Sequence, residues 1–222
     1  EETLARALDD VAERAERGAP DAREALVGIV DALATERAKD LAQRLREEAV
    51  GRSLPALDRL LRAPSPRLSL APPERIAQGK DGRPLTLGER KALARKPDPQ
   101  TLAKLFADPD PEVVRRLLDN PRMTEADVVR MVAKRPARPE ILAVVARSTR
   151  WIHRSRVRLA LLLNPDTPPD IAAPITSLLA KQELEEVVAA IPVHPAVRAL
   201  CLERLERKPP FESDAPENGA IH

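Results

Sequence analysis

Aromatic side chains are almost absent from this chain of 222 residues. Two Phe, one Trp and no Tyr make up 1% of the sequence, although 43% of the residues are apolar. A core must therefore be built from Leu, Ala, Val and Ile, which suits helices better than β-sandwiches or barrels. Only seven Gly are present, too few for many tight turns. The composition predicts an all-α fold.

Residues that could carry chemistry are also scarce. The one Cys, Cys201, excludes an internal disulfide and indicates a reducing compartment, so we expect a cytoplasmic protein. The three His, at positions 153, 194 and 222, are too scattered for a metal site. No Gly-x-Ser-x-Gly or catalytic Cys signature occurs, and residues 78–82 lack the strand and the Gly-Lys-Ser/Thr ending of a phosphate loop. We expect no enzyme activity and no cofactor.

No run of about 18 apolar residues occurs, so we expect no membrane span. Apolar stripes at helical spacing instead predict helices over residues 1–62, with a second helix from about 21 to 50 and a short third one near 54–61. The short linker after the first helix predicts an antiparallel helical hairpin. The first stripe packs within the chain or serves self-association; it consists of Leu4, Leu8, Val11 and Ala15.

The rest of the chain divides by its Pro content. Residues 63–85 hold five Pro and two Gly without periodicity and predict a linker. Over residues 86–207, short apolar helices alternate with turns that contain Pro and N-capping residues. Such helices are unstable alone, so they must be held by stacking in an α-solenoid of degenerate helical repeats. Residues 208–222 are acidic and contain Pro, which predicts a disordered tail.

One signature occurs twice in the repeat region, 44 residues apart. Each copy carries a Val, two Leu and an Asn-Pro pair at matching positions, in residues 113–121 and 157–165. Self-similarity at this spacing is typical of helical repeats, in which each helical pair buries its apolar face against its neighbours. We expect the side-chain amides of Asn120 and Asn164 to satisfy backbone groups where the following Pro stops the helix.

The two copies resemble a known repeat. Residues 108–121 and 157–169 are similar to the leucine-rich repeat variant of bacteria, whose repeats of about 24 residues carry a DPDPxVR…NPxTP pattern. The resemblance covers about residues 92–206 and implies HEAT-like helical pairs, a fold that carries no single activity. The intervals between Pro residues are irregular, which indicates degenerate repeats. A cysteine cluster for iron–sulfur binding accompanies some members of that family, and this sequence has none.

Positive charge is concentrated in residues 130–158. This segment holds nine Arg and Lys and one Glu, a net charge of +8, whereas the rest of the chain sums to −6. In the helix predicted over 150–163, three Arg recur at i, i+4 and i+8 and form one ridge. Like charges at this spacing repel each other, and an anionic ligand relieves the repulsion. The predicted binding ridge consists of Arg147, Arg150, Trp151, Arg154 and Arg158.

Two interpretations of the ridge remain open. Either it is solvated or neutralised by Glu183, Glu185 and Glu186, with Trp151 as a core anchor, or it binds an acidic protein segment or nucleic acid. The repeat pattern and the missing chemistry favour a non-enzymatic scaffold or adaptor that binds a partner protein. The alternative is a nucleic-acid-binding HEAT-like protein that uses the Arg-rich residues 147–158. A single Trp and a net charge of +2 argue against that alternative.

Overall fold

The computed structural model of the chain describes residues 1–33, 35–62, 76–79, 81–96 and 98–206, except for the side chain of Glu36. The described residues form helices and no strand, which confirms the predicted all-α class. The predicted tail and residues 63–75 of the predicted linker lie outside the described residues. None of the described helices is both long and apolar enough to cross a membrane.

The chain divides into two compact units. Unit 1 takes in the described residues of 1–64, 173–191 and 195–222, and unit 2 those of 65–172 and 192–194. The sequence predicts two helical units, residues 1–62 and residues 86–207, joined by a linker. The structure differs, because the helices at the two ends of the chain share unit 1, and the division falls within α12 (Pro169–Thr176).

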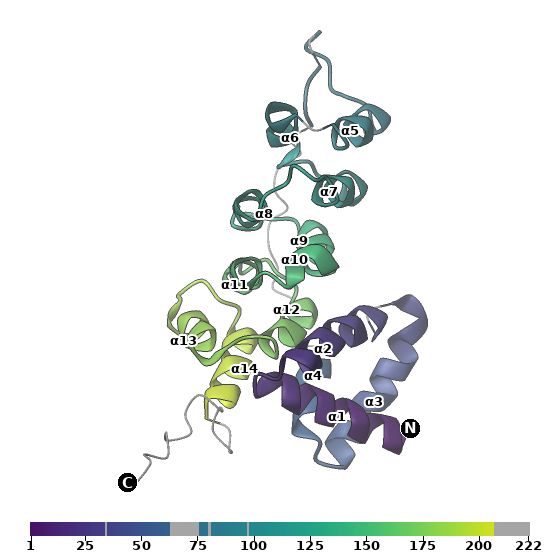
Figure 1. The fold of residues 1–222 in the computed structure, drawn as a ribbon, viewed down its shortest axis with the longest axis vertical. Helices are drawn as coiled ribbons and strands as arrows, with labels where there is room; N and C mark the ends of the chain where they lie inside the picture. The colour runs from purple at the N-terminus through teal and green to yellow at the C-terminus, as the bar shows by residue number, and fades with distance from the viewer. Residues whose placement is uncertain (34, 63–75, 80, 97, 207–222) are drawn as a thin grey trace, which may run out of the picture. The chain divides into compact units, whose positions relative to one another are not determined.

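Unit 1 begins with four helices rather than the predicted hairpin and short third helix (Figure 1). They are α1 (Glu2–Glu16), α2 (Pro20–Leu33), α3 (Lys39–Gly51) and α4 (Pro55–Leu61). α1 contacts α2 and α4, and α3 contacts α4.

The prediction of a single helix from about residue 21 to residue 50 is therefore wrong. A 3₁₀ turn, η1 (Glu36–Ala38), separates α2 from α3. A continuous helix of this length would extend for about 45 Å. The turn instead allows α2 to contact α1 while α3 lies against α4, so more apolar surface is buried.

The buried face of α1 shares only Ala15 with the predicted stripe, whose Leu8 and Val11 are half-buried. Leu4 is 44% exposed, and the buried apolar side chains are three Ala. Small side chains allow neighbouring helices to approach closely, so the face of α1 that packs inward is the Ala face. The buried residues of α1 are Ala5, Ala12, Ala15 and Glu16.

Glu16, at the end of α1, is a fully buried carboxylate that joins four parts of unit 1. Nε and Nη2 of Arg59, on α4, donate to Oε1 and Oε2 of Glu16 at 3.0 and 2.7 Å. The hydroxyl of Ser177, just after α12, donates to Oε1 at 3.4 Å, and Nε of Arg204 lies 3.9 Å from Oε1. Arg204, on α14 (Pro195–Leu205), also donates to the backbone carbonyls of Glu16, at 2.8 Å, and Thr176. The carboxylate and the two guanidinium groups thus tie α1, α4, α12 and α14 together.

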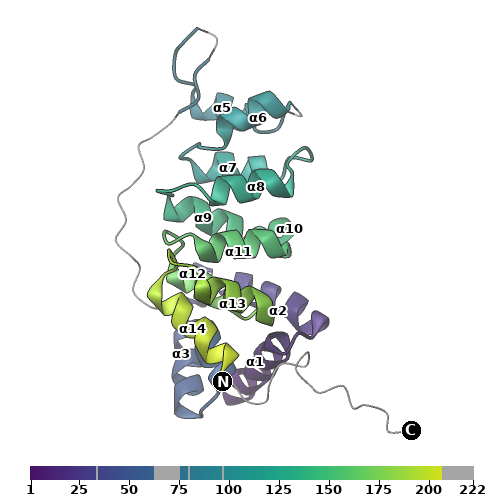
Figure 2. The same cartoon turned by 90° about the vertical axis from the view of Figure 1, so that its left-hand side faces the viewer.

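Unit 2 is a stack of short helices in two rows (Figure 2). In one row α5 contacts α7 and α7 contacts α9, and in the other α8 contacts α11 (Figure 1). The helices are α5 (Leu87–Leu93), α6 (Pro99–Leu105), α7 (Pro111–Leu118), α8 (Glu125–Val132), α9 (Pro139–Ala146), α10 (Thr149–Ile152) and α11 (Ser155–Leu163).

Local sequence determines where these helices begin. Thr86 and Glu89 form the predicted capping box of α5, in which each side chain bonds the backbone N–H of the other residue. Asp98 and Asp110 cap α6 and α7, each followed by Pro in the first turn. Arg83 and the N–H and hydroxyl of Thr86 lower the pKa of Glu89 to about 2, so this cap stays ionised at neutral pH.

The two Asn-Pro junctions connect successive helical pairs. Nδ2 of Asn120 donates to the carbonyls of Ala94 and Lys96, at 2.8 and 2.9 Å, just beyond the end of α5. Nδ2 of Asn164 donates to the carbonyls of Val132 and Lys134, at 2.6 and 3.1 Å, at the end of α8. The predicted use of these amides to satisfy backbone groups is confirmed, but the carbonyls lie at the ends of the earlier helices α5 and α8 rather than in the helix that the Pro ends.

The side-chain oxygen of each Asn accepts a hydrogen bond from the backbone N–H two residues later and so stabilises the turn that follows. Oδ1 of Asn120 accepts from the N–H of Arg122 at 2.9 Å, and Oδ1 of Asn164 from the N–H of Asp166 at 3.0 Å. Both Asn are buried, at 3% and 2% exposure. Each amide therefore satisfies three backbone groups that have little access to water.

Replacing Asn120 or Asn164 with Ala should lower the free energy of unfolding by about 1 kcal/mol or more, because buried carbonyls lose their donor. Denaturant titration measures the loss. Asn120→Asp is the informative companion, since it keeps the acceptor and removes the donor. Unchanged midpoints for both Ala variants would show that the junctions do not stabilise the fold.

Replacing Glu16 with Ala should lower the free energy of unfolding by about 3 kcal/mol or more, because the buried guanidinium group of Arg204 and the partly buried one of Arg59 lose their carboxylate. Glu13→Ala, one turn earlier on the same helix, is the matched control. The side chain of Glu13 is 41% exposed and pairs with Arg17, so its loss should cost less than about 0.5 kcal/mol. Equal losses for the two variants would contradict the role given to Glu16.

Candidate functional site

The helix predicted over residues 150–163 is broken, so the predicted ridge does not follow one helical line. α10 ends at Ile152 and α11 begins at Ser155. A continuous helix would place Ile152 about 140° around the axis from Val157. Both side chains are buried, at 4% and 0% exposure. The chain therefore changes direction between them so that both reach the core.

The side chains of Trp151 and Arg150 donate hydrogen bonds to backbone carbonyls at the end of α7. The indole Nε1 of Trp151, which is 4% exposed, donates to the carbonyl of Leu118 at 2.9 Å. Nη1 of Arg150 donates to the carbonyls of Leu118 and Asn120 at 3.2 and 3.0 Å, and Nη2 reaches that of Met123 at 3.5 Å. The guanidinium lies 4.5 Å from the centre of the Trp151 ring, within cation–π distance. Trp151 is the core anchor that one interpretation required, and Arg150 is a structural donor.

The remaining ridge residues have different roles. Arg158, on α11, donates from Nη1 to the carbonyls of Ile152 and His153 at 3.2 and 3.0 Å and so closes the end of α10. Arg147 follows the last residue of α9 and Arg154 precedes the first residue of α11. Both side chains are exposed, and neither pairs with a carboxylate among the described residues. Arg147 and Arg154 are therefore the two of the four ridge arginines whose side chains make no hydrogen bond among the described residues, whereas Arg150 is exposed but donates to backbone carbonyls.

Three further exposed cations, which the sequence analysis did not predict as site residues, follow the ends of α5 and α7. Arg95 and Lys96 follow α5, and Arg122 follows α7. The signal that could have found them is the 24-residue spacing of Lys96-Pro97 and Asn120-Pro121. In stacked helical repeats equivalent positions meet at one edge, so this spacing would predict that cations at equivalent positions lie near each other.

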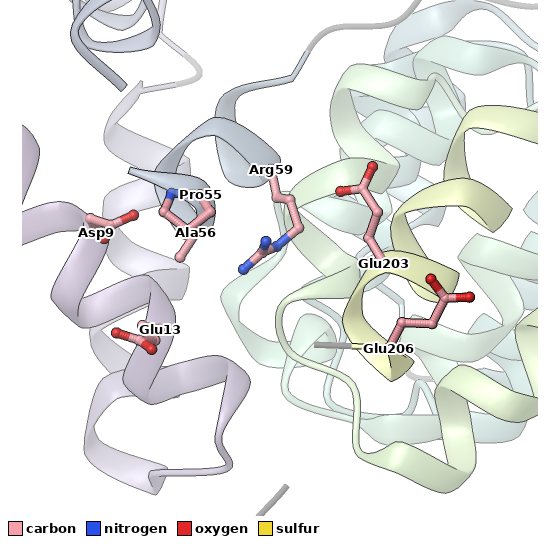
Figure 3. Close-up of a pocket in the computed structure, with 7 residues that line it drawn as sticks. All are labelled: Asp9, Glu13, Pro55, Ala56, Arg59, Glu203 and Glu206. Carbon is pink, nitrogen blue, oxygen red and sulfur yellow. The ribbon is translucent and has the colours of Figure 1, made fainter. Parts of the chain in front are cut away.

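One hollow in unit 1 is lined mostly by acidic residues and has a volume of about 450 Å³ (Figure 3). Its lining residues are Asp9, Glu13, Pro55, Ala56, Arg59, Glu203 and Glu206. Several of its charges already have partners. Asp9 accepts from the N–H of Leu57 at 2.9 Å and caps α4, while Glu13 pairs with Arg17 and Glu203 with Arg62. These pairs give most of the carboxylates a structural role.

Two observations concern the residue types that could act as a nucleophile or bind a metal. Burial raises the pKa of the Cys201 thiol to about 12, so the thiol stays protonated at neutral pH. No group of three or more His, Cys, Asp and Glu within the described ranges could hold a metal ion.

Comparisons with known proteins return no match. No protein-family model matches the chain, and no curated protein or solved structure does so either. The likeness to the leucine-rich repeat variant therefore rests on the motifs quoted above and stays a prediction.

Replacing Arg150 with Ala should lower the free energy of unfolding by about 1–2 kcal/mol, because carbonyls at the end of α7 lose a charged donor. Chemical denaturation followed by the emission of Trp151, the one Trp in the sequence, measures the loss. The matched control is Arg156→Ala, an exposed position on α11, which should shift stability by less than about 0.5 kcal/mol. Similar small effects at both positions would contradict the structural role given to the hydrogen bonds of Arg150.

Proposed function

We propose that this protein is a non-enzymatic scaffold or adaptor, in which a HEAT-like α-solenoid binds an acidic segment of a partner protein. The supporting observation is the set of exposed arginines in unit 2 that have no carboxylate partner among the described residues. Arg147 and Arg154 belong to this set, and Arg156 lies beside them. Uncompensated charges attract a ligand of opposite charge and guide its approach.

The distribution of charge between the two units supports this proposal. Residues 76–172, within unit 2, contain 19 Lys and Arg and 12 Asp and Glu, a net charge of +7. Residues 1–62 and 173–206 contain 14 Lys and Arg and 19 Asp and Glu, a net charge of −5. The net charge of the whole chain is thus near zero although unit 2 is basic, and the positive charge of unit 2 favours an anionic partner.

The burial of Trp151 favours a protein partner over a nucleic acid. Single-stranded nucleic acid is commonly held by bases that stack on exposed aromatic rings. Trp151 is 4% exposed and its N–H is already bonded to a carbonyl, so it offers no such surface. A cytoplasmic, bacterial setting is part of the same proposal and rests on the single Cys and on the resemblance.

Replacing both Arg147 and Arg154 with Glu should abolish binding of the partner, because the charge of the surface is reversed. The fold should stay intact, because neither side chain makes a described hydrogen bond. The measurement is affinity capture on wild-type and variant protein, followed by identification of the bound proteins. Lys104→Glu with Arg130→Glu, on α6 and α8, is the control with the same change in charge and should retain the partner.

A partner that the double variant still captures would place the binding surface elsewhere and contradict the proposal. Binding to duplex DNA that weakens steeply with salt, together with no protein partner, would support the nucleic-acid alternative instead.

A further inference from the structure

The ends of α5, α7 and α9 meet at one edge of unit 2. The side chain of Asn120, just beyond α7, reaches the carbonyls of Ala94 and Lys96, just beyond α5. The side chain of Arg150, on the short helix α10 that connects α9 to α11, reaches the carbonyls of Leu118 and Asn120 at the end of α7. These hydrogen bonds place three successive loops side by side along the row of helices (Figure 2).

Five exposed cations lie in these three connections, the third of which runs from Arg147 through α10 to Arg154, and together they form what we term the basic edge. None of them pairs with a carboxylate of a described residue. The residues of the basic edge are Arg95, Lys96, Arg122, Arg147 and Arg154. The edge thus extends the pair of arginines in the proposed function across three helical repeats.

The step between repeats fixes the spacing that a ligand must match. Packed helices lie about 8–10 Å apart, so cations on successive loops recur at about that interval. An extended peptide advances about 3.3 Å per residue, and about three residues therefore span one step. Three loops correspond to about seven residues of extended chain.

We propose that the basic edge binds an extended peptide segment that carries an acidic side chain at about every third residue. This inference rests on the proposed function and adds to it the register and length of the ligand. Each carboxylate meets one loop: the first Arg95 and Lys96, the second Arg122, and the third Arg147 and Arg154. Arginine can hold a carboxylate through two parallel hydrogen bonds, which favours a defined register.

The same edge is poorly suited to a phosphate backbone. Asp98 and Asp119 lie in the first and second of these loops, close in sequence to the cations. A nucleic acid strand carries charge at every residue and meets these carboxylates, whereas a peptide can place neutral residues against them. The edge therefore selects for intermittent rather than continuous negative charge.

The test uses two fluorescent peptides of about seven residues with the same composition and net charge. One has Glu at positions one, four and seven with Ser between them, and the other has its three Glu adjacent. Fluorescence anisotropy with the full chain at low ionic strength gives each Kd. The spaced peptide should bind about tenfold more tightly than the clustered one.

Single reversals then test each loop. Lys96→Glu and Arg122→Glu should each weaken binding of the spaced peptide about tenfold, and Lys104→Glu, the charge-matched control on α6, should not. Because these side chains are exposed, circular dichroism and the denaturation midpoint should stay unchanged, which separates lost binding from lost folding.

The possible failures are distinguishable. If both peptides bind equally and only reversal of Arg147 and Arg154 weakens them, the three-loop register is wrong and the proposed function stands. If neither peptide binds and the reversal of Arg147 and Arg154 retains the captured partner, the proposed function is wrong as well. If a duplex oligonucleotide binds through Lys96 and Arg122 while neither peptide does, the basic edge is a nucleic-acid surface and the inference is overturned.

Discussion

The need to satisfy open carbonyl groups at the ends of short helices is the constraint on which unit 2 depends. An α-helix leaves its last four carbonyls without partners inside the helix. In an eight-residue helix such as α7 these are half of all its carbonyls. The helices stack closely, so water reaches few of these groups, and side chains must supply the donors. The Asn-Pro junctions and Arg150 meet this need across successive repeats.

The same constraint accounts for the use of arginine in this chain. A guanidinium group has several N–H donors in a fixed plane and can serve more than one carbonyl. Arg135 donates to the carbonyl of Leu163 at 2.7 Å, and Arg158 and Arg198 each bond two carbonyls beyond helix ends. In unit 1, Arg204 does so while facing the buried carboxylate of Glu16. Much of the positive charge that the composition displays is thus part of the fold.

The arginines that remain open are the basis for the proposed function. Arg150, Arg158 and Arg147 lie within twelve residues of one another and have the same chemistry, yet the first two donate to backbone carbonyls and the third makes no described hydrogen bond. The difference arises from the turn between α10 and α11, which brings Arg158 to the end of α10. The arginines of a basic patch are therefore best assessed one by one, according to whether each donates to a backbone carbonyl or makes no hydrogen bond within the fold.

The sequence by itself determined the helical class, the starts of many helices and the structural role of Asn120 and Asn164. These features depend on local chemistry: N-capping side chains, Pro at the first turn and apolar periodicity. Only the tertiary structure decided the break after Ile152, the turn between α2 and α3, and the membership of the amino-terminal helices in the same unit as α13 (Lys181–Ala189) and α14. It also decided which arginines are structural donors. Those outcomes depend on contacts between residues far apart in the chain, such as Glu16 with Arg204 and Trp151 with Leu118, and local patterns carry no information about them.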